Sequence, residues 1–304
     1  MPTRLSTRGP AGALAACALL LAACGSSNNS TNNTGGGGAS GITATKVASI
    51  ASELPSSFAS KGKLVVAADA TYAPNEFFDK DGTTIIGMDA DLTKAIGQVL
   101  GVSVEMQNAK FDSILAGITA GKYDLGASSL TDTKEREKTI DFVDYYNAGT
   151  SFYVLASGGP SITKLDDLCG HKVAVERGTT QLDDATAQDK TCKSAGKPGV
   201  TVDASDDQNG VNLSLTSARD EVAMADSPVA DDAVKNSGGK FKISGQPYGV
   251  APYGIAMAKG NGLSKPINDA IKELISDGVY KRIMDKWGIA DGAVSSTQVN
   301  GAQS

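Results

Sequence analysis

The chain has 304 residues, of which 40% are hydrophobic and 20% are charged. This length allows one large domain or two of medium size, and the composition is ordinary for a folded globular protein. The formal net charge is −6. A nucleic-acid-binding domain would carry a strongly basic face, so the charge argues against that class of protein.

The first residues have the pattern of an export signal. Arg4 and Arg8 form a basic segment, and the small apolar residues 11–23 make a run too short to span a bilayer. The run ends in Leu21-Ala22-Ala23-Cys24-Gly25, which resembles the processing sequence of bacterial lipoproteins. We therefore expect residues 1–23 to be a signal peptide and Cys24 to be lipidated, with an ordinary secretory signal as the alternative.

Residues 24–42 consist largely of Ser, Asn, Thr and Gly and offer almost nothing to bury. Such a composition predicts a flexible linker. With a lipid on Cys24, the linker would hold the rest of the chain at the outer face of the cytoplasmic membrane.

Two further cysteines, Cys169 and Cys192, lie in the part of the chain that would be exported. An oxidising compartment favours a disulfide between them, and two buried free thiols are the alternative. A metal site is not expected, because the exported part of the chain would have one His and, besides the lipidated Cys24, no other cysteine to complete a coordination shell.

The elements alternate along the chain after a weakly amphipathic helix expected at residues 43–59. The first series comprises strand 64–68, helix 89–100, strand 102–106, helix 111–120 and strand 123–127. A second series comprises strands at 172–176, 200–203, 221–225, 241–243 and 254–258, helices at 181–190, 208–218 and 228–236, and one or two helices at 265–287. This rhythm predicts an α/β fold with mainly parallel sheets flanked by helices.

Polar residues follow several of the predicted strands. Asp69 follows the first strand, Ser128 to Arg136 follow the strand at 123–127, Arg177 to Gln181 follow the strand at 172–176, and Asp226 follows the strand at 221–225. Ligands of open α/β sheets bind beyond the carboxyl ends of the strands. These segments therefore predict a ligand site.

Three stretches carry a family resemblance that extends over about residues 61–289. They are Ile86-Gly87-Met88-Asp89-Ala90-Asp91-Leu92-Thr93-Lys94-Ala95-Ile96, then Ser128 to Arg136, then Val173 to Thr180. In this order they resemble the amino-acid-binding proteins of ABC importers, the group that includes the histidine-, glutamine- and lysine/arginine/ornithine-binding proteins. The resemblance implies two lobes around a cleft, with two hinge crossings near residues 151–156 and 248–256. Lobe one would comprise residues 61–152 and 250–304, and lobe two residues 153–249.

The resemblance also implies roles for individual residues. Arg136 would bind the ligand carboxylate, with help from Ser129, Thr131, Thr179 and Thr180, and its planar fork suits that anion. Asp226 would accept from the ligand ammonium. The alternatives are a solvated helix face for Arg136 and a helix cap for Asp226.

Four more positions would surround the ligand side chain. Tyr72 and Phe111 match residues that enclose the side chain in the family, with core packing as the alternative. Asp69 and Glu176 would place two carboxylates near that pocket, which would favour a cationic or amide ligand.

The resemblance predicts an extracytoplasmic solute-binding protein, without catalytic residues or cofactor. It would act as a monomer, capture an amino acid by hinge closure and deliver it to membrane permease subunits driven by a cytoplasmic ATPase. Three alternatives remain: a dehydratase of the prephenate or arogenate type on the same scaffold, a sensor that presents its ligand to a receptor, and an importer protein for another small polar solute.

Overall fold

The computed structural model describes residues 42–303. The predicted signal peptide, Cys24 and the linker up to residue 41 lie outside the described residues. In the first part of the chain the elements are α1 (Ala48–Ala51), α2 (Ser56–Lys61), β1 (Lys63–Ala68), β2 (Thr71–Tyr72), β3 (Glu76–Phe78), β4 (Ile85–Ile86), α3 (Met88–Leu100), β5 (Ser103–Asn108), α4 (Phe111–Thr119) and β6 (Leu125–Gly126).

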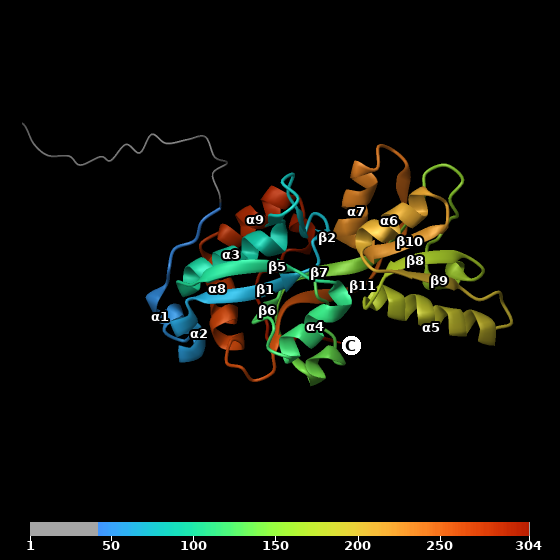
Figure 1. Ribbon diagram of the computed structural model, residues 1–304. Helices are drawn as coiled ribbons and strands as arrows, with labels where there is room; N and C mark the ends of the chain where they lie inside the picture. The colour runs from blue at the N-terminus through green and yellow to red at the C-terminus, as the bar shows by residue number, and fades with distance from the viewer. Residues whose placement is uncertain (1–41, 304) are drawn as a thin grey trace, which may run out of the picture. The chain divides into compact units, whose positions relative to one another are not determined.

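The elements of the remaining chain include two long strands, and Figure 1 shows most of them in place. They are η1 (Arg136–Lys138), β7 (Ile140–Leu155), η2 (Leu165–Leu168), β8 (Lys172–Glu176), α5 (Thr180–Ser194), β9 (Thr201–Ser205), α6 (Gln208–Thr216), β10 (Val222–Asp226), α7 (Ser227–Asn236), β11 (Phe241–Ala258), α8 (Ser264–Ser276), α9 (Val279–Trp287) and η3 (Ala290–Gly292).

One eight-stranded sheet runs through both lobes in the order β5-β1-β6-β11-β7-β10-β8-β9. Strand β1 pairs in parallel with β5 and β6, and β8 pairs in parallel with β9 and β10. The two parallel groups are joined by the antiparallel pair of β7 and β11. A small second sheet contains β2, β3 and β4.

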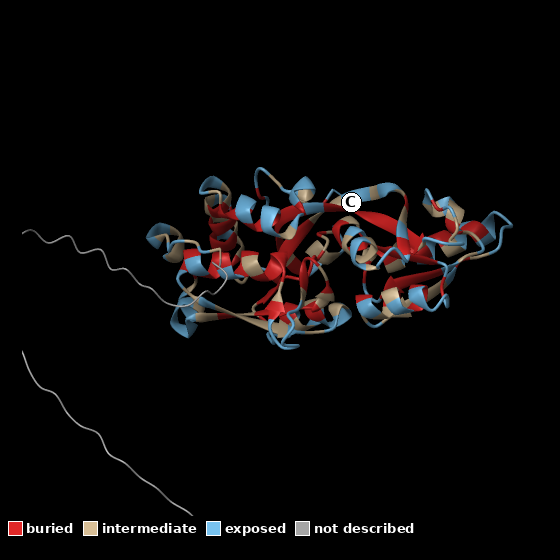
Figure 2. Ribbon diagram, turned by 90° about the horizontal axis from the view of Figure 1, so that it is seen from above, coloured by how far each residue is buried: buried red, intermediate tan, exposed pale blue. Residues whose placement is uncertain are grey.

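The two lobes have separate cores, which confirms the predicted two-lobe α/β fold. Leu64, Leu92, Ile96 and Ile271 belong to the core that packs α3, α8 and α9 onto the strands of the first lobe. Residues of β8, β10 and α5 form a core of the second lobe, which contains Cys192. Figure 2 shows that buried residues follow the strands, while exposed residues gather on the outer faces of the helices and in the loops.

Local sequence signals explain several of the element ends. Helix α3 ends at Gly101, whose φ of 72° lies in the left-handed region that favours glycine. Helix α5 begins after Thr179, whose side chain accepts a hydrogen bond from the amide of Leu182.

The predicted disulfide is present. Cys169 and Cys192 are joined, and their Cα atoms lie 5.6 Å apart, a usual spacing for a disulfide. The bond ties the end of η2 to α5, so it fixes that helix against the second lobe.

Two sequence expectations were wrong in detail. The helix expected at residues 43–59 is two short helices, α1 and α2, because Pro55 cannot continue a helix and stands just before α2. The strands expected at 241–243 and 254–258 are parts of the single strand β11, whose bulges absorb the residues between them.

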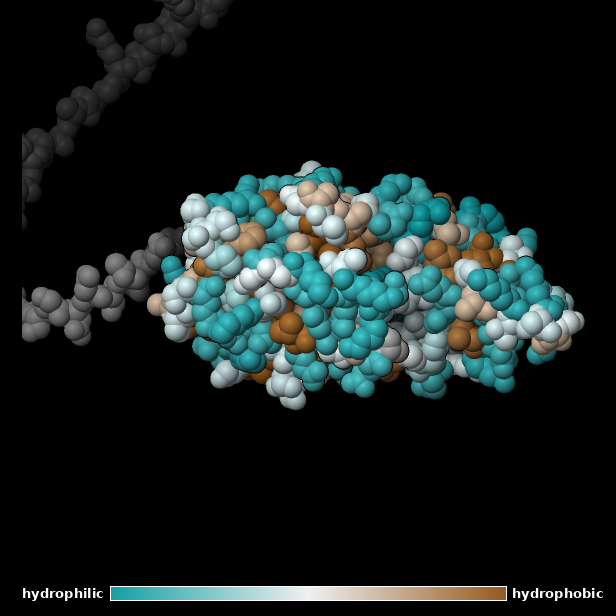
Figure 3. All heavy atoms as spheres, turned by 90° about the horizontal axis from the view of Figure 1, so that it is seen from below, coloured by the Kyte–Doolittle hydropathy of each residue, from teal (hydrophilic) through white to brown (hydrophobic). Residues whose placement is uncertain are grey.

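The surface is largely polar. The face in Figure 3 is covered mainly by hydrophilic side chains, with apolar ones in small groups. Between residues 42 and 303, no helix is long and apolar enough to cross a membrane.

Candidate functional site

Most of the predicted ligand-binding residues surround one small cavity. Its lining residues are Tyr72, Phe111, Ser129, Thr131, Glu176, Thr179, Thr180, Gln181 and Asp226. They follow or flank strands of both lobes. The cavity has a volume of about 10 Å³, roughly the space that one water molecule needs, so the two walls lie almost against each other.

Asp226 and Tyr72 connect the two walls. The Tyr72 hydroxyl donates to Oδ2 of Asp226 at 2.9 Å, and the amide of Asp226 donates back to the hydroxyl at 3.0 Å. Asp226 stands just before α7, but its side chain makes no capping hydrogen bond there. The alternative that Asp226 is merely a helix cap therefore fails.

Gln181 lies in a segment that the sequence placed at the site, but no role was predicted for it. Its amide donates to Oδ1 of Asp226 at 2.8 Å and to Oγ1 of Thr150 at 2.9 Å. The sequence places Gln181 in the first turn of a helix, where a polar residue is unremarkable. Its place directly after Gly178-Thr179-Thr180, a turn predicted to bind the ligand, indicates that its side chain lies near the cleft.

Arg136 lies between the lobes but does not line the cavity itself. Its Nη1 donates to the carbonyl of Thr131 at 2.7 Å, and its Nη2 donates to the carbonyl of Gly178 at 3.0 Å. Its Cζ lies 5.8 Å from the centre of the Phe111 ring, within the range of a cation–π contact. Arg136 is half-buried here, so it is not part of a solvated helix face.

Ser129 and Thr179 line opposite walls and are both buried. Ser129 has a φ of 49°, in the left-handed region that non-glycine residues rarely adopt. Thr179 caps α5 and also donates through Oγ1 to the carbonyl of Glu176 at 2.7 Å. The Thr180 hydroxyl donates to Oε1 of Gln181 at 3.4 Å.

Asp69 lies behind the cavity rather than on its wall. Its Oδ1 accepts from the Thr71 hydroxyl at 2.7 Å, and its Oδ2 accepts from the Phe111 amide at 3.1 Å. Both oxygens therefore already have partners within the first lobe. The carboxylate holds the start of α4 in place and adds negative charge behind the site.

Glu176 is the acid on the wall that lacks partners. Its side chain is 2% exposed, and its Oε1 has no hydrogen-bond partner among the described residues. Burial, followed by the nearby charges of Asp69, Asp207 and Asp226, raises the pKa of Glu176 well above its usual range. Burial also raises the pKa of Asp226. Burial and the neighbouring acids therefore favour the neutral form of Glu176 in the ligand-free site.

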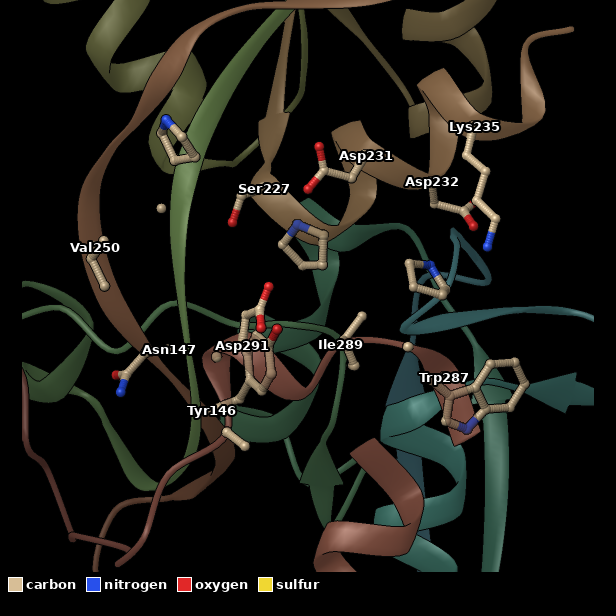
Figure 4. Close-up of a pocket in the computed structure, with 17 residues that line it drawn as sticks. Tyr146, Asn147, Ser227, Asp231, Asp232, Lys235, Val250, Trp287, Ile289 and Asp291 are labelled. Atoms are coloured by element: carbon tan, nitrogen blue, oxygen red, sulfur yellow. The ribbon is translucent and has the colours of Figure 1, made fainter. Parts of the chain in front are cut away.

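A second and larger cavity lies elsewhere. Its volume is about 440 Å³, and Figure 4 shows its wall of Asp231, Asp232 and Lys235 on one side and Trp287, Ile289 and Asp291 on the other. Burial and then the charge of Asp291 raise the pKa of Asp231. None of the predicted ligand-binding residues lines this cavity, so we place the site at the smaller one.

No metal centre is evident within residues 42–303. Cys169 and Cys192 are bound to each other, and this part of the chain has no group of three or more His, Cys, Asp or Glu side chains placed to hold an ion.

Comparison with known proteins fits this geometry. The chain is 33% identical over 260 residues to the arginine-binding protein ArgT of Corynebacterium glutamicum, which covers 85% of each chain. An ancestral arginine-binding protein bound to arginine superposes with a TM-score of 0.68 and 38% identity, over 74% of this chain and 98% of the other. The same kind of ancestral protein bound to glutamine gives a TM-score of 0.69 and 37% identity, over 75% and 98%.

The model of one family matches residues 64–290, which include every residue of the cavity wall. The chain belongs to the bacterial extracellular solute-binding proteins of family 3.

Proposed function

We propose that this protein captures a basic amino acid, with arginine as the first candidate, and delivers it to an ABC importer. The observation that carries the proposal is the unpartnered, buried Oε1 of Glu176 on the cavity wall. A guanidinium or ammonium group would give this oxygen a donor and offset the negative charge of its surroundings. The arginine-binding relatives support the same choice.

The α-groups of the ligand would occupy the other end of the site. Arg136 would exchange its bonds to the carbonyls of Thr131 and Gly178 for a two-pronged bond to the carboxylate. Backbone amides at the start of α5 would add donors, because a helix N-terminus favours an anion. Asp226 would accept from the ammonium in place of Tyr72 or Gln181.

Binding would require the lobes to part and close again. A cavity of about 10 Å³ holds no amino acid, so the ligand would enter an open form. We place the division between residues 61–152 with 250–304 and residues 153–249, with β7 and β11 as the hinge. A ligand that contacts both lobes would stabilise the closed form, which permease subunits would recognise.

A thermal-shift screen tests the proposed ligand class. The purified protein would be heated with each of the twenty amino acids, ornithine and citrulline. Arginine at about 100 times its dissociation constant is expected to add roughly 2.7 kcal/mol to the free energy of unfolding. Stabilisation by glutamate or aspartate, without any by arginine, lysine, histidine or glutamine, would contradict the proposal.

We further propose that the protein is anchored to the membrane through a lipid on Cys24, as the sequence Leu21 to Cys24 indicates. Cys24→Ala is then expected to move the protein from the membrane fraction to the soluble fraction of the cells. Cys169→Ala, which removes a cysteine of the disulfide, is the control and should stay with the membrane. A Cys24→Ala protein that remains in the membrane fraction would show that the anchor lies elsewhere.

A further inference from the structure

Two carboxyl groups lie buried directly behind Ser129. Glu76 begins β3 and Asp89 lies in the first turn of α3, and both side chains are 0% exposed. Neither lines the cavity. No Lys, Arg or His within the described residues forms an ion pair with either of them, so their charge is not offset by a cation.

The chain between Glu76 and Asp89 explains why these two residues lie close together. The amide of Met88 donates to the carbonyl of Pro74 at 3.2 Å, and the amide of Asp89 donates to the carbonyl of Asn75 at 2.9 Å. A Cβ at Gly87 would lie 2.1 Å from that Asn75 carbonyl oxygen, and the φ of Gly87 is 127°. Glycine at this position therefore lets the start of α3 lie directly against the segment that carries Glu76.

The hydrogen bonds to the two carboxyls come mostly from the site segment. The amide of Ser129 donates to Oδ2 of Asp89 at 2.7 Å, and the Tyr145 hydroxyl donates to Oδ1 at 2.6 Å. The hydroxyls of Ser128 and Ser129 donate to Glu76 at 3.0 and 3.2 Å. Ser129 therefore contacts both carboxyls, Asp89 through its amide and Glu76 through its hydroxyl.

The two buried carboxyls meet at Ser129, and no cation lies beside them within the described residues. Two adjacent carboxylates without a cation and without solvent would repel each other strongly, so a single shared proton is the stable arrangement. Tyr145, from β7, is the titratable group that faces the pair, and Tyr280, from α9, lies behind it with its hydroxyl bonded to the Tyr145 carbonyl.

We propose that Glu76 and Asp89 hold one proton between them, with Glu76 as the acid and Asp89 as the carboxylate, and that this pair positions Ser129 for ligand binding. Both are positioning residues, since they act through Ser129 and touch no ligand. The charged Asp89 carboxylate accepts a hydrogen bond from the Ser129 amide, and this bond holds Ser129 in its left-handed conformation. The role in binding rests on the function proposed above, whereas the shared proton does not.

The direction of the pKa shifts agrees with this assignment. Burial, and then the charge of Asp89, raises the pKa of Glu76 well above its usual range. Burial raises the pKa of Asp89 to about 6. The larger rise in pKa at Glu76 is the direction expected if Glu76 holds the proton beside an ionised Asp89.

The proposal predicts opposite outcomes for two acid-to-amide changes. Gln can donate to Asp89 as a protonated Glu76 does, so Glu76→Gln is expected to bind L-arginine within about threefold of the parent, a difference below roughly 0.7 kcal/mol. An Asn at position 89 would point its amide NH₂ group at one of the groups that donate a hydrogen bond to Asp89. Asp89→Asn is therefore expected to bind L-arginine at least tenfold more weakly. Asp91→Asn, on the same helix and bonded instead to Lys286 and Trp287, is the matched control and should bind like the parent.

The pH dependence separates positioning by a shared proton from a purely structural role. Raising the pH removes the proton from the pair in the parent, whereas Gln has none to lose. The affinity of the parent for L-arginine is therefore expected to fall relative to that of Glu76→Gln as the pH rises above neutral. Ionisation of the arginine itself affects both proteins equally and cancels in this ratio.

Two measurements test the pair without any ligand. Infrared difference spectra, parent minus Glu76→Gln at neutral pH, are expected to show the carbonyl band of a protonated carboxyl. The amide proton resonance of Ser129 is expected to be shifted downfield in the parent and in Glu76→Gln, and to move upfield in Asp89→Asn.

These results also distinguish the two proposals. A parent that binds no amino acid would overturn the proposed function, while the infrared band would still decide the shared proton. Absence of the protonated-carboxyl band, or equal loss of arginine binding in Glu76→Gln and Asp89→Asn with the Asp91→Asn control intact, would overturn the inference. If Asp89→Asn does not fold, the infrared band and the pH ratio of Glu76→Gln decide it.

Discussion

The hydroxyl of Tyr72 donates a hydrogen bond of 2.9 Å to Oδ2 of Asp226, although the two residues are 154 positions apart in the chain. Tyr72 belongs to the small sheet beside the first lobe, and Asp226 ends β10 in the second. The bond therefore holds the lobes together with groups that a ligand would also use.

Removing that bond should loosen the closed form of the ligand-free protein. A hydrogen bond to a charged group contributes about 1.5–3 kcal/mol, so Tyr72→Phe is expected to shift the balance toward the open form by roughly tenfold or more. Small-angle X-ray scattering would show this as a larger radius of gyration without ligand, reversed by arginine. Tyr123→Phe, in the core of the first lobe, is the control. An unchanged radius of gyration for Tyr72→Phe would show that this bond does not hold the lobes closed.

The raised pKa of Glu176 predicts that a proton is released when arginine binds. Its pKa is raised in the ligand-free site by burial and by neighbouring acids, and a bound cation would lower it again. At a pH between these two values Glu176 loses its proton as arginine binds, so the affinity for arginine should rise with pH across that window. Calorimetry in buffers of different ionisation enthalpy would measure the released proton.

Glu176→Gln should abolish that proton release and weaken arginine binding by at least tenfold, while binding of glutamine is reduced less. Glu105→Gln, at a partly exposed acid paired with Lys63, serves as the control. Proton release that persists in Glu176→Gln would mean that another group titrates on binding.

The C-terminal segment covers a second pair of acids, Asp132 and Asp144, whose ionisation affects the stability of the fold. Asp132 and Asp144 are buried, and Oδ1 of each has no hydrogen-bond partner within residues 42–303. The amide of Ala302 donates to Oδ2 of Asp132 at 3.2 Å. Burial is the main cause that raises the pKa of Asp144 to about 8 and that of Asp132 to about 6. Glu137 adds to both shifts, while the charge of Lys134 opposes the shift of Asp132.

The pKa values of Asp132 and Asp144 are both raised above the usual 3.8. Protonation of these carboxyls therefore stabilises the folded protein. This contribution to the free energy of unfolding is complete below about pH 4 and is lost as the pH rises through about 6 and about 8. Asp144→Asn cannot ionise and is expected to be more stable than the parent at pH 8 by on the order of 1 kcal/mol. Urea denaturation at pH 5 and pH 8 would measure it, with the exposed Asp285→Asn as control; a parent whose stability does not fall between these pH values would contradict it.

Much of the fold could be predicted because local signals are strong. The spacing of Leu92, Ile96 and Val99 with Gly101 after them predicts α3, and the structure confirms it. Strand β7 was not predicted, because Asp144 and Asn147 interrupt its apolar residues and its partner β11 lies about a hundred residues away. Long-range pairing of this kind leaves little trace in a local pattern.

The same contrast applies to the site. Residues that directly follow parallel strands, such as Ser129 and Asp226, could be predicted to converge, because the carboxyl ends of those strands meet. No role was predicted for Gln181, because that role depends on Asp226 from another strand. Glu76 and Asp89 were missed because acids in a sequence suggest a solvated surface, and only the three-dimensional fold buries them together.

Arg136 carries the central claim that the cleft between the lobes binds the carboxylate of an amino acid. Loss of one member of a charge pair in a closed cleft costs about 2–5 kcal/mol, which corresponds to a loss of roughly 30-fold to several-thousand-fold in affinity. Arg136→Lys should also weaken binding, since an ammonium lacks the planar fork. The amide of arginine, without the carboxylate charge, should bind poorly to the parent.

The most direct test is isothermal titration calorimetry of arginine against the parent and Arg136→Ala, with thermal unfolding to show that both are folded. We predict tight binding to the parent and a loss of at least about 30-fold in Arg136→Ala. Binding to Arg136→Ala within about threefold of the parent, a difference below roughly 0.7 kcal/mol, would contradict the assignment of this cleft as the amino-acid site.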